Sequence, residues 1–400
     1  MLQGLKVVEY ASYIAAPGAG GILADWGADV VKVEPLAGDP IRGFFESIGS
    51  EASGNPVFEL DNRGKRSLAL DTSTAEGMGV LKRLIAKADV FLTNVRPAAL
   101  ARASLYYQNL NAFNARLVYA VITGYGLAGT EADKPGMDVA AFWSRAGVGR
   151  LTTPKDAEII PCRTGMGDHM TSLSAVAGIM GALYARGRDG KGRMVETSLL
   201  RNGIYAIGSD MAIQLRLGRI ASTKARTQSP NPIGNFFKTA DGHWICLLPR
   251  QGNKDWAEMC AAMERPDLVA DPRFSSPKAR RENREAVVAE LDRVFVSRPL
   301  ADWAFALDSR DIIWAPVQTP AEVAADPQAA ACGAFVDVPD GEGGARRAPA
   351  TPVSFPSSPL GFLRKSPELG EHTREVLSEC GYSSSDIEAL AAAGAITAGA

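Results

Sequence analysis

Short β-branched and apolar runs alternate with helical patterns through the first third of this 400-residue chain. Such near-continuous runs are typical of strands that are covered on both faces. Five strands are predicted on this basis, at residues 6–10, 29–33, 67–70, 89–93 and 117–121. The stretch 75–87 has its apolar side chains at helical spacing. Strand–helix–strand alternation predicts an α/β fold with a doubly wound, Rossmann-like parallel sheet, whose ligands bind at the carboxyl ends of the strands.

The second half of the chain has a mixed pattern that predicts a separate, smaller domain. Residues 194–217 are predicted as one long helix, and the polar segment 221–232 as a linker. Beyond the linker we expect a hairpin, two helices and a strand, then a loop and two short helices, at 235–248, 253–263, 278–296, 312–317, 340–348, 370–380 and 385–393. We therefore expect a large α/β domain of residues 1–224 and 331–400, with a small α+β domain at 225–330.

The composition is that of an ordinary globular protein, and it argues against several kinds of partner. The chain has 46% hydrophobic residues and a formal net charge of −2, so its charge points neither to nucleic acid nor to an anionic membrane. No run is long enough to span a bilayer, and no secretory leader is recognised. Its five cysteines are scattered without a Cys-x-x-Cys pair, which predicts a reduced, cytoplasmic protein without a structural metal.

A Gly-rich segment at 16–21 follows the first predicted strand and invites comparison with a dinucleotide-binding loop. In that interpretation Glu34 would bind the ribose. The G-x-G-x-x-G fingerprint, however, needs a Gly or Ala where this chain has Leu23, whose bulk opposes close helix–strand packing. A P-loop is also missing from the sequence. We therefore expect neither a nicotinamide nor a flavin cofactor, and no ATP.

Asp168 lies where a Gly-rich turn leads into a helix of small residues. Asp is a favoured N-cap, and a helix N-terminus stabilises an ionised carboxylate. Taken alone, the position is better explained as a structural cap than as a functional residue. His169 adjoins it, but neighbours on a helix do not face each other, so we interpret His169 as structural.

Three polar side chains follow predicted strands and could join Asp168 at the carboxyl edge of the sheet. They are Asn94, Arg102 and Lys134. Cations and amides gathered at that edge suit a phosphorylated ligand. The alternative is that Arg102 and Lys134 are solvated surface charges, as most Lys and Arg residues are.

Seven segments, in order and at consistent spacing, carry a family resemblance over nearly the whole chain. They are LKVVE (5–9), GILADWGADVVKVE (21–34), NRGKRS (62–67), TGYG (123–126), GD (167–168), GKGR (190–193) and GEHT (370–373). With these segments the chain resembles the class III CoA-transferases, the family of formyl-CoA transferase, the carnitine CoA-transferases and α-methylacyl-CoA racemase. Each segment alone is a weak signal, and the combination is specific.

The resemblance implies a function in acyl-CoA metabolism, with acyl-CoA and a free carboxylic acid as substrates. Asp168 matches the family's nucleophile, which attacks the thioester to give a mixed anhydride and then an aspartyl-CoA thioester. The resemblance also implies CoA contacts from Ala15, Leu70, Asn94, Arg102 and Lys134, and an interlocked homodimer. Two departures from the family pattern occur, because Pro35 replaces a CoA-contacting arginine and Ala103-Ser104 replaces Leu-Gly.

Other functions remain open at this point. The racemase branch has a His where this chain has Met137, and racemisation needs a base on each face of the α-carbon. We therefore favour a transferase over a racemase or epimerase. A non-catalytic acyl-CoA-binding protein and a dehydrogenase are further alternatives. The stretch 133–147 looks more like the branches that handle carnitine-type, aryl or bile acids than those that handle formyl or oxalate groups.

Overall fold

The structure is a computed structural model, and it describes residues 1–49, 54–250, 252–357 and 363–397. Its internal contacts divide the chain into two compact units. The larger unit consists of Met1–Gly149, Ile160–Ile220 and Gly333–Ala400, and the smaller unit of Arg150–Ile159 and Ala221–Cys332. Every helix among the described residues is too short or too polar to cross a lipid bilayer.

The larger unit is built on a six-stranded sheet in which each neighbouring pair of strands is parallel. In spatial order the strands are β3 (Arg66–Ala69), β2 (Asp29–Glu34), β1 (Lys6–Tyr10), β4 (Val90–Thr93), β5 (Val118–Thr123) and β6 (Met194–Ser198). The first five along the chain confirm the predicted strands to within two residues at each end. The strand order changes direction between β1 and β4, and ligands of such sheets bind at this point.

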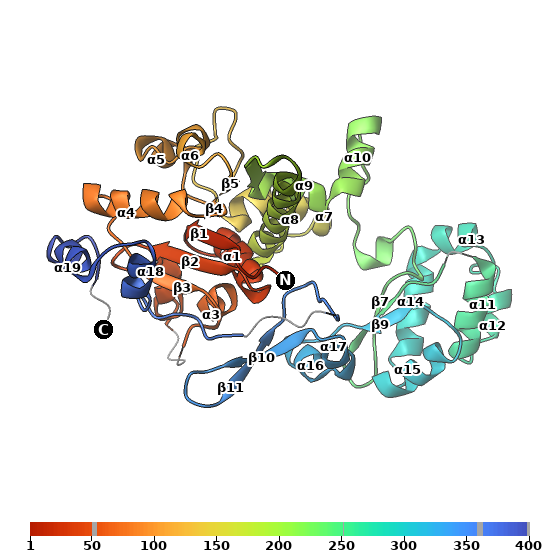
Figure 1. Ribbon diagram of the computed structural model, residues 1–400. Helices are drawn as coiled ribbons and strands as arrows, with labels where there is room; N and C mark the ends of the chain where they lie inside the picture. The colour runs from red at the N-terminus through yellow and green to blue at the C-terminus, as the bar shows by residue number, and fades with distance from the viewer. Residues whose placement is uncertain (50–53, 251, 358–362, 398–400) are drawn as a thin grey trace. The chain divides into compact units, whose positions relative to one another are not determined.

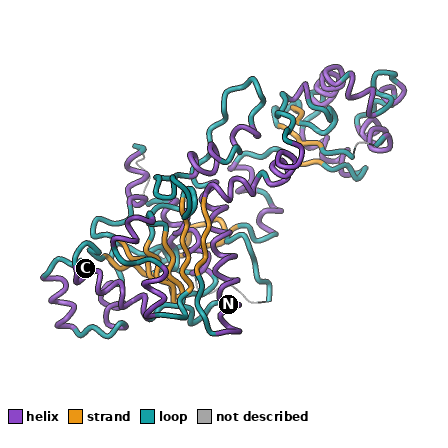
Figure 2. The backbone as a smooth tube through the Cα atoms, turned by 90° about the horizontal axis from the view of Figure 1, so that it is seen from above, coloured by secondary structure: helices purple, strands orange, loops and turns teal. Residues whose placement is uncertain are grey.

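Helices cover both faces of the sheet (Figure 2). One face packs on α1 (Ala15–Asp25) and α8 (Met166–Asp189), and the other on α4 (Ala75–Ala86), α6 (Tyr107–Phe113), α18 (Thr373–Glu379) and α19 (Ser384–Ala392). Successive side chains of a strand point to opposite faces, so Val7 joins the first core and Val8 the second. The sheet is therefore doubly wound. Shorter helices of this unit are η1 (Pro40–Gly43), α2 (Phe44–Ser47), α3 (Pro56–Asn62), α5 (Pro97–Arg102) and η2 (Val139–Arg145), and α7 (Val148–Thr152) follows them.

The prediction of a single helix over 194–217 is wrong. Its first residues form β6, which pairs with β5 from Tyr119↔Met194 to Thr123↔Ser198. Ser198 then ends the strand and caps α9 (Leu199–Ala206), because its Oγ accepts from the Arg201 N–H at 3.1 Å. The helix α10 (Gly208–Leu217) follows. Tertiary pairing with β5 therefore decides the conformation of this stretch.

A buried network of charges joins the first three strands. Lys32 Nζ lies 3.2 Å from Glu9 Oε1 and 2.8 Å from Asp39 Oδ2. Lys65 Nζ lies 2.7 Å from Glu9 Oε2 and 2.9 Å from Asn62 Oδ1. Burial lowers the pKa of Lys65 to about 8, and the Glu9 charge opposes that shift. Glu9 is thus the shared counter-ion of two buried lysines.

The C-terminal helices return to the N-terminal part of the sheet, where α18 and α19 lie near β3 and α4 (Figure 1). Arg66 Nη1 lies 2.8 Å from Glu375 Oε1, and Lys87 Nζ donates to the Cys380 carbonyl at 3.0 Å. Ser383 caps α19 in a capping box with Asp386.

The prediction of a loop over 340–348 is wrong in part. A hairpin of β10 (Phe335–Pro339) and β11 (Ala345–Pro349) occupies this region. Strand β11 reads ARRAP, with little of the β-branched or aromatic content that identifies a strand in sequence.

The smaller unit has an antiparallel sheet of β7 (Phe236–Lys238), β8 (Trp244–Leu247) and β9 (Trp314–Pro316), at the predicted hairpin and strand. Its helical elements are η3 (Arg226–Gln228), α11 (Asn253–Ala262), α12 (Asp267–Ala270), α13 (Pro277–Glu282), α14 (Arg284–Phe295), α15 (Leu300–Asp308), α16 (Pro320–Ala325) and α17 (Pro327–Ala331). The prediction of one helix over 278–296 is wrong, because the chain breaks at Asn283 between α13 and α14. A separate apolar core includes Trp256, Phe295 and Trp303.

Candidate functional site

Asp168 lies in the first turn of α8, and it is not the N-cap that the sequence predicts. Gly165 occupies that position with φ +82°, a left-handed conformation that suits Gly, and no side chain caps the helix. The Met166 N–H donates to the Arg163 carbonyl at 3.2 Å, whereas the Asp168 N–H donates to no group among the described residues. The carboxylate of Asp168 therefore sits on a helix end that still has a free N–H group.

Close packing at Gly167 fixes the position of Asp168. A Cβ atom on Gly167 would lie 2.6 Å from Phe142 Cγ, so only Gly fits. Phe142 belongs to η2, and its ring is buried with Leu199 of α9 in one apolar cluster. The first turn of α8 is thereby pressed against η2.

We expect Gly167→Ala to destabilise the protein by about 1–3 kcal/mol, because the added methyl group overpacks against Phe142. The matched control is Gly181→Ala in the same helix, where a Cβ meets no atom within 4 Å. That change should stabilise by about 0.5–1 kcal/mol through helix propensity. Urea unfolding measures both. Equal effects of the two substitutions would contradict the packing argument.

Asp138 is the acidic neighbour that most affects Asp168. It precedes η2, where its Oδ1 accepts from the Val139 N–H at 2.7 Å and its Oδ2 accepts from the Gly165 N–H at 3.0 Å. It therefore anchors the turn before α8. Burial, and then the negative charge of Asp138, raise the pKa of Asp168 to about 7. A carboxylate with such a pKa can change its protonation state near neutral pH.

His169 pairs with a buried carboxylate that sequence reasoning missed. Its Nε2 lies 3.0 Å from Oδ1 of Asp61, a residue of α3 that is 3% exposed. The hydrogen bond to Asp61 raises the pKa of His169. A negative residue on a short helix gives no sequence signal of such a partner. Asp138 could have been found, because Asp immediately before an apolar helical run is an N-cap pattern.

Two predicted ligand contacts lie beside the point where the strand order changes direction. Ala15 begins α1 after β1, and its carbonyl accepts from Ser172 Oγ at 2.7 Å. Asn94 follows β4, and its side chain pairs with the Ser12 backbone in both directions, at 3.0 and 2.7 Å. These bonds bring the loops after β1 and β4 together, while they occupy the amide of Asn94.

Arg102 and Lys134 lie in neighbouring segments. Arg102 is the exposed last residue of α5, and the start of that helix is tied to the next loop because the Ala98 N–H donates to Asp133 Oδ1 at 2.9 Å. Lys134 Nζ lies 2.9 Å from Glu131 Oε1 and 5.6 Å from the Tyr125 ring centroid. Arg102 has no ion pair among the described residues, so its charge is available.

Leu70 differs from the other predicted contacts, because its side chain is buried in the core of the larger unit. The strand that precedes it ends at Ala69, and Leu70 forms an isolated antiparallel bridge with Ile396. Any ligand contact at Leu70 therefore involves its backbone or its surroundings more than its side chain.

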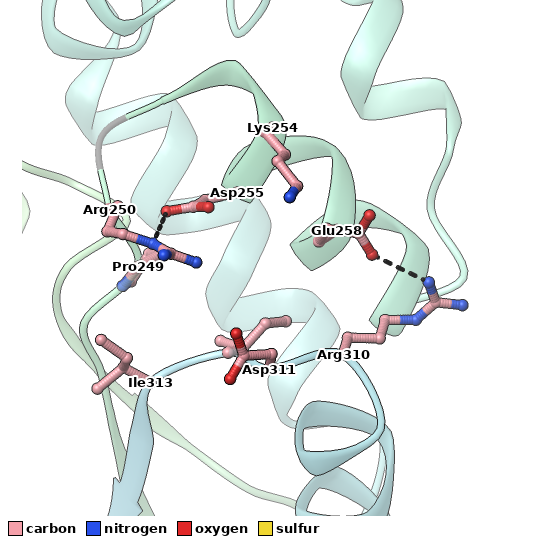
Figure 3. A pocket seen from close by; sticks show the side chains of 9 residues that line it. Pro249, Arg250, Lys254, Asp255, Glu258, Arg310, Asp311 and Ile313 are labelled. Carbon is pink, nitrogen blue, oxygen red and sulfur yellow. Dashed lines mark hydrogen bonds and ion pairs between the residues drawn. The ribbon is translucent and has the colours of Figure 1, made fainter.

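Two pockets of about 310 and 230 Å³ occur among the described residues, and Asp168 lines neither of them. The first lies at the ends of β5 and β6, with Tyr125, Leu200 and Arg201 among its lining residues. The second belongs to the smaller unit (Figure 3), where Arg250 pairs with Asp255 at 3.2 Å and Arg310 with Glu258 at 3.3 Å. Four of its charges thus neutralise one another. Within the described part of the chain, no group of three or more His, Cys, Asp or Glu residues could hold a metal ion.

Known proteins resemble this chain along almost its whole length. A family model for CoA-transferase family III matches residues 2–373. The chain is 33% identical over 386 residues to an (R)-2-hydroxy-4-methylpentanoate CoA-transferase of Clostridioides difficile, covering 96% of each chain. It is also 33% identical over 399 residues to a cinnamoyl-CoA:phenyllactate CoA-transferase of Clostridium sporogenes, covering 98% of this chain and 96% of the relative. A crystal structure of a CAIB/BAIF family protein from Brucella suis superimposes with a TM-score of 0.84 at 31% identity, covering 94% of this chain and 98% of the other.

Proposed function

This chain belongs to CoA-transferase family III, and on that premise we propose that it moves CoA from an acyl-CoA donor to a free carboxylic acid by way of Asp168. The carboxylate attacks the thioester carbonyl, the C–S bond breaks, and CoA leaves as the thiolate. The thiolate then attacks Cγ of Asp168 and releases the donor acid, which leaves an aspartyl-CoA thioester. The acceptor carboxylate then attacks Cγ of the aspartyl thioester and displaces the CoA thiolate, which gives a second mixed anhydride. The thiolate attacks the acceptor carbonyl of this anhydride, which forms the new acyl-CoA and releases the Asp168 carboxylate.

The observation that carries this proposal is the environment of Asp168. A pKa raised to about 7 leaves the carboxylate ionised at slightly alkaline pH and more basic than an ordinary Asp, which favours nucleophilic attack. The free N–H at the start of α8 supports stabilisation of the oxyanion that forms on the attacked carbonyl. Met137 stands in place of the His that the racemase branch needs, so we favour transfer over racemisation.

The test is to mix the protein with an acyl-CoA and a free acid and to follow the formation of a new thioester. The two relatives named above put 2-hydroxy acids with apolar side chains first in the panel of acceptors. A racemase would exchange the α-hydrogen without a new thioester, and a binding protein would do neither. Absence of transfer across branched, aromatic and dicarboxylic acids would refute the proposal.

We place CoA at the loops that follow β1, β4 and β5, with its phosphates near Arg102 and Lys134. The backbone of Ala15, the loop of Asn94 and the surroundings of Leu70 complete the proposed site. The free charge of Arg102 supports this placement. Because Pro35 lacks the charge of an arginine, we expect a looser adenine end than in formyl-CoA transferase.

Arg102→Ala is expected to weaken CoA binding by about 1–3 kcal/mol, or about 5- to 150-fold in Kd, because a charge-assisted phosphate contact is lost. Isothermal titration with CoA measures this. The control is Arg188→Ala, which removes another exposed arginine, near the end of α8, and should leave Kd unchanged. An unaltered Kd in Arg102→Ala would mean that the phosphates bind elsewhere.

We further propose that the protein acts as an interlocked homodimer in the cytoplasm, with domains at 1–224 plus 331–400 and at 225–330. Large apolar side chains of α9 and α10 support a covered surface, since Tyr205 is 86% and Leu215 80% exposed in the single chain. All five cysteines are free, which suits a reducing compartment. Sedimentation at micromolar concentration tests the dimer, and a monomer there would contradict it.

A further inference from the structure

The pair of Asp61 and His169 has a geometry that a merely structural contact does not require. Oδ1 of Asp61 faces His169 Nε2 at 3.0 Å, while Oδ2 of Asp61 has no hydrogen-bond partner among the described residues. A buried carboxylate that lacks partners is costly unless a positive charge compensates it. The unpaired oxygen therefore favours a protonated imidazole on His169.

Close backbone contacts hold the pair in place. A Cβ atom on Gly18 of α1 would lie 2.7 Å from Ser172 Oγ and 3.3 Å from Asp61 Oδ1. A Cβ on Gly21 would lie 2.7 Å from the Asp61 carbonyl oxygen. The glycines of α1 thus let both α3 and α8 pack closely against it, and this packing brings Asp61 to His169.

The charges around this pair explain what it could do. Three charged groups affect the pKa of Asp168: Asp138 and Asp61 are negative, and His169 is positive. Those that face His169 are Asp61 from α3, Asp168 from its own helix and Asp138 from the segment before η2. Lys65 also lies near Asp61, but its Nζ already donates to Glu9, Asn62 and the Pro17 carbonyl. His169 is therefore the positive group placed to act on Asp168.

We propose that Asp61 and His169 form a charge-setting pair, in which buried Asp61 keeps His169 protonated and the imidazolium keeps Asp168 anionic among three carboxylates. The role assigned to Asp168 rests on the proposed function. His169 acts through Asp168 and is a positioning residue, since it need not touch the substrate. Its side chain is 44% exposed, so the charge stands at the surface of the site without full burial.

The pair has a definite consequence for pH dependence. Asp168 titrates with a pKa of about 7, and the His169 charge holds it from rising further. Asp61 raises the pKa of His169, so a larger share of the imidazole carries its charge where Asp168 loses its proton. Loss of the His169 charge would move the ionisation of Asp168, and with it the acid limb of the rate profile, to higher pH.

His169→Gln is expected to move the acid limb of kcat/KM upward by about one pH unit, which is about tenfold in rate at pH 6, with the alkaline plateau retained. The amide of the introduced glutamine can still donate a hydrogen bond to Asp61. If the role of His169 were only structural, the acid limb of kcat/KM would therefore stay in place. The double variant Asp61→Asn with His169→Gln should bring the limb back toward wild type, because Asp61 itself raises the pKa of Asp168. The control is His243→Gln, since His243 pairs with Glu322 at 3.1 Å in the smaller unit. It should not move the limb.

Proton NMR tests the pair without any activity, because the chain has three His residues. The His169 ring resonance should titrate above the ordinary range and show a second inflection near pH 7, and Asp168→Asn should abolish that inflection. This result would support the pair even if Asp168→Asn kept full turnover, which would refute only the proposed function. An ordinary His169 titration without the inflection, or an unmoved acid limb in His169→Gln, would overturn the proposal.

Discussion

Asp168→Asn is expected to lower kcat for CoA transfer by on the order of ten-thousand-fold or more, because the amide cannot attack a thioester as an anion. The side chain keeps its shape, and Gly165 rather than Asp168 occupies the N-cap. No capping bond is therefore lost, and CoA binding should persist. Single-turnover kinetics with a matched acyl donor measures the loss. The control is Asp189→Asn at the exposed other end of α8, which should turn over normally.

Stability gives this experiment a second readout. The pKa of Asp168 is raised to about 7 in the folded protein, above its unfolded value, so ionisation of the folded protein at higher pH costs stability. The Asn variant should consequently melt at or above the wild-type temperature at pH 8. Reaction of the wild type with acyl-CoA and then with borohydride should also label Asp168. Normal turnover of the variant, or labelling of another residue, would end the nucleophile proposal.

Glu9→Gln is expected to destabilise the protein by about 3–5 kcal/mol, because two buried lysines lose a shared counter-ion. Lys32 keeps Asp39 at 2.8 Å, whereas Lys65 keeps only neutral acceptors. Lys65 has a pKa of about 8 with Glu9 present, and this value should fall further without it. The neutral amine relieves the penalty, so the destabilisation should shrink between pH 6 and pH 9 in urea unfolding.

The control for this prediction is Glu388→Gln on α19, where the exposed side chain should change stability by less than about 0.5 kcal/mol. A Glu9→Gln variant as stable as wild type at pH 6 would show that the network contributes little. A penalty that did not change with pH would show that Lys65 stays charged without Glu9.

The parallel sheet could be predicted because most of its strands are buried on both faces and contain runs of apolar side chains. Val118–Thr123 is buried at every position, so it appears in the sequence as an uninterrupted, largely apolar run. A helix with one solvent-exposed face would have polar residues within such a run. The strand β6 could not be recognised, because Met194 to Glu196 are only half buried and the run continues into helical residues. Its conformation depends on pairing with β5, which is far away in the sequence.

The candidate site was predictable only as far as single positions carry signals. Asp168 stands after a Gly-rich turn, and family resemblance identifies it, while its helix position was misjudged because Gly165 offers no side chain to recognise as a cap. The pairing of His169 with Asp61 spans 108 residues of sequence. It depends on glycines in α1 that let two helices approach, and such a contact has no periodicity to detect.

The division into units determines when each unit can be completed during synthesis. The smaller unit is complete once Cys332 has been made, but the larger one needs Gly333–Ala400, whose helices pack against β3 and α4. Until then the edge strand β3 lacks the cover of α18, and unpaired edges promote aggregation. Nascent chains should therefore depend on chaperones late in synthesis, after the smaller unit has already folded.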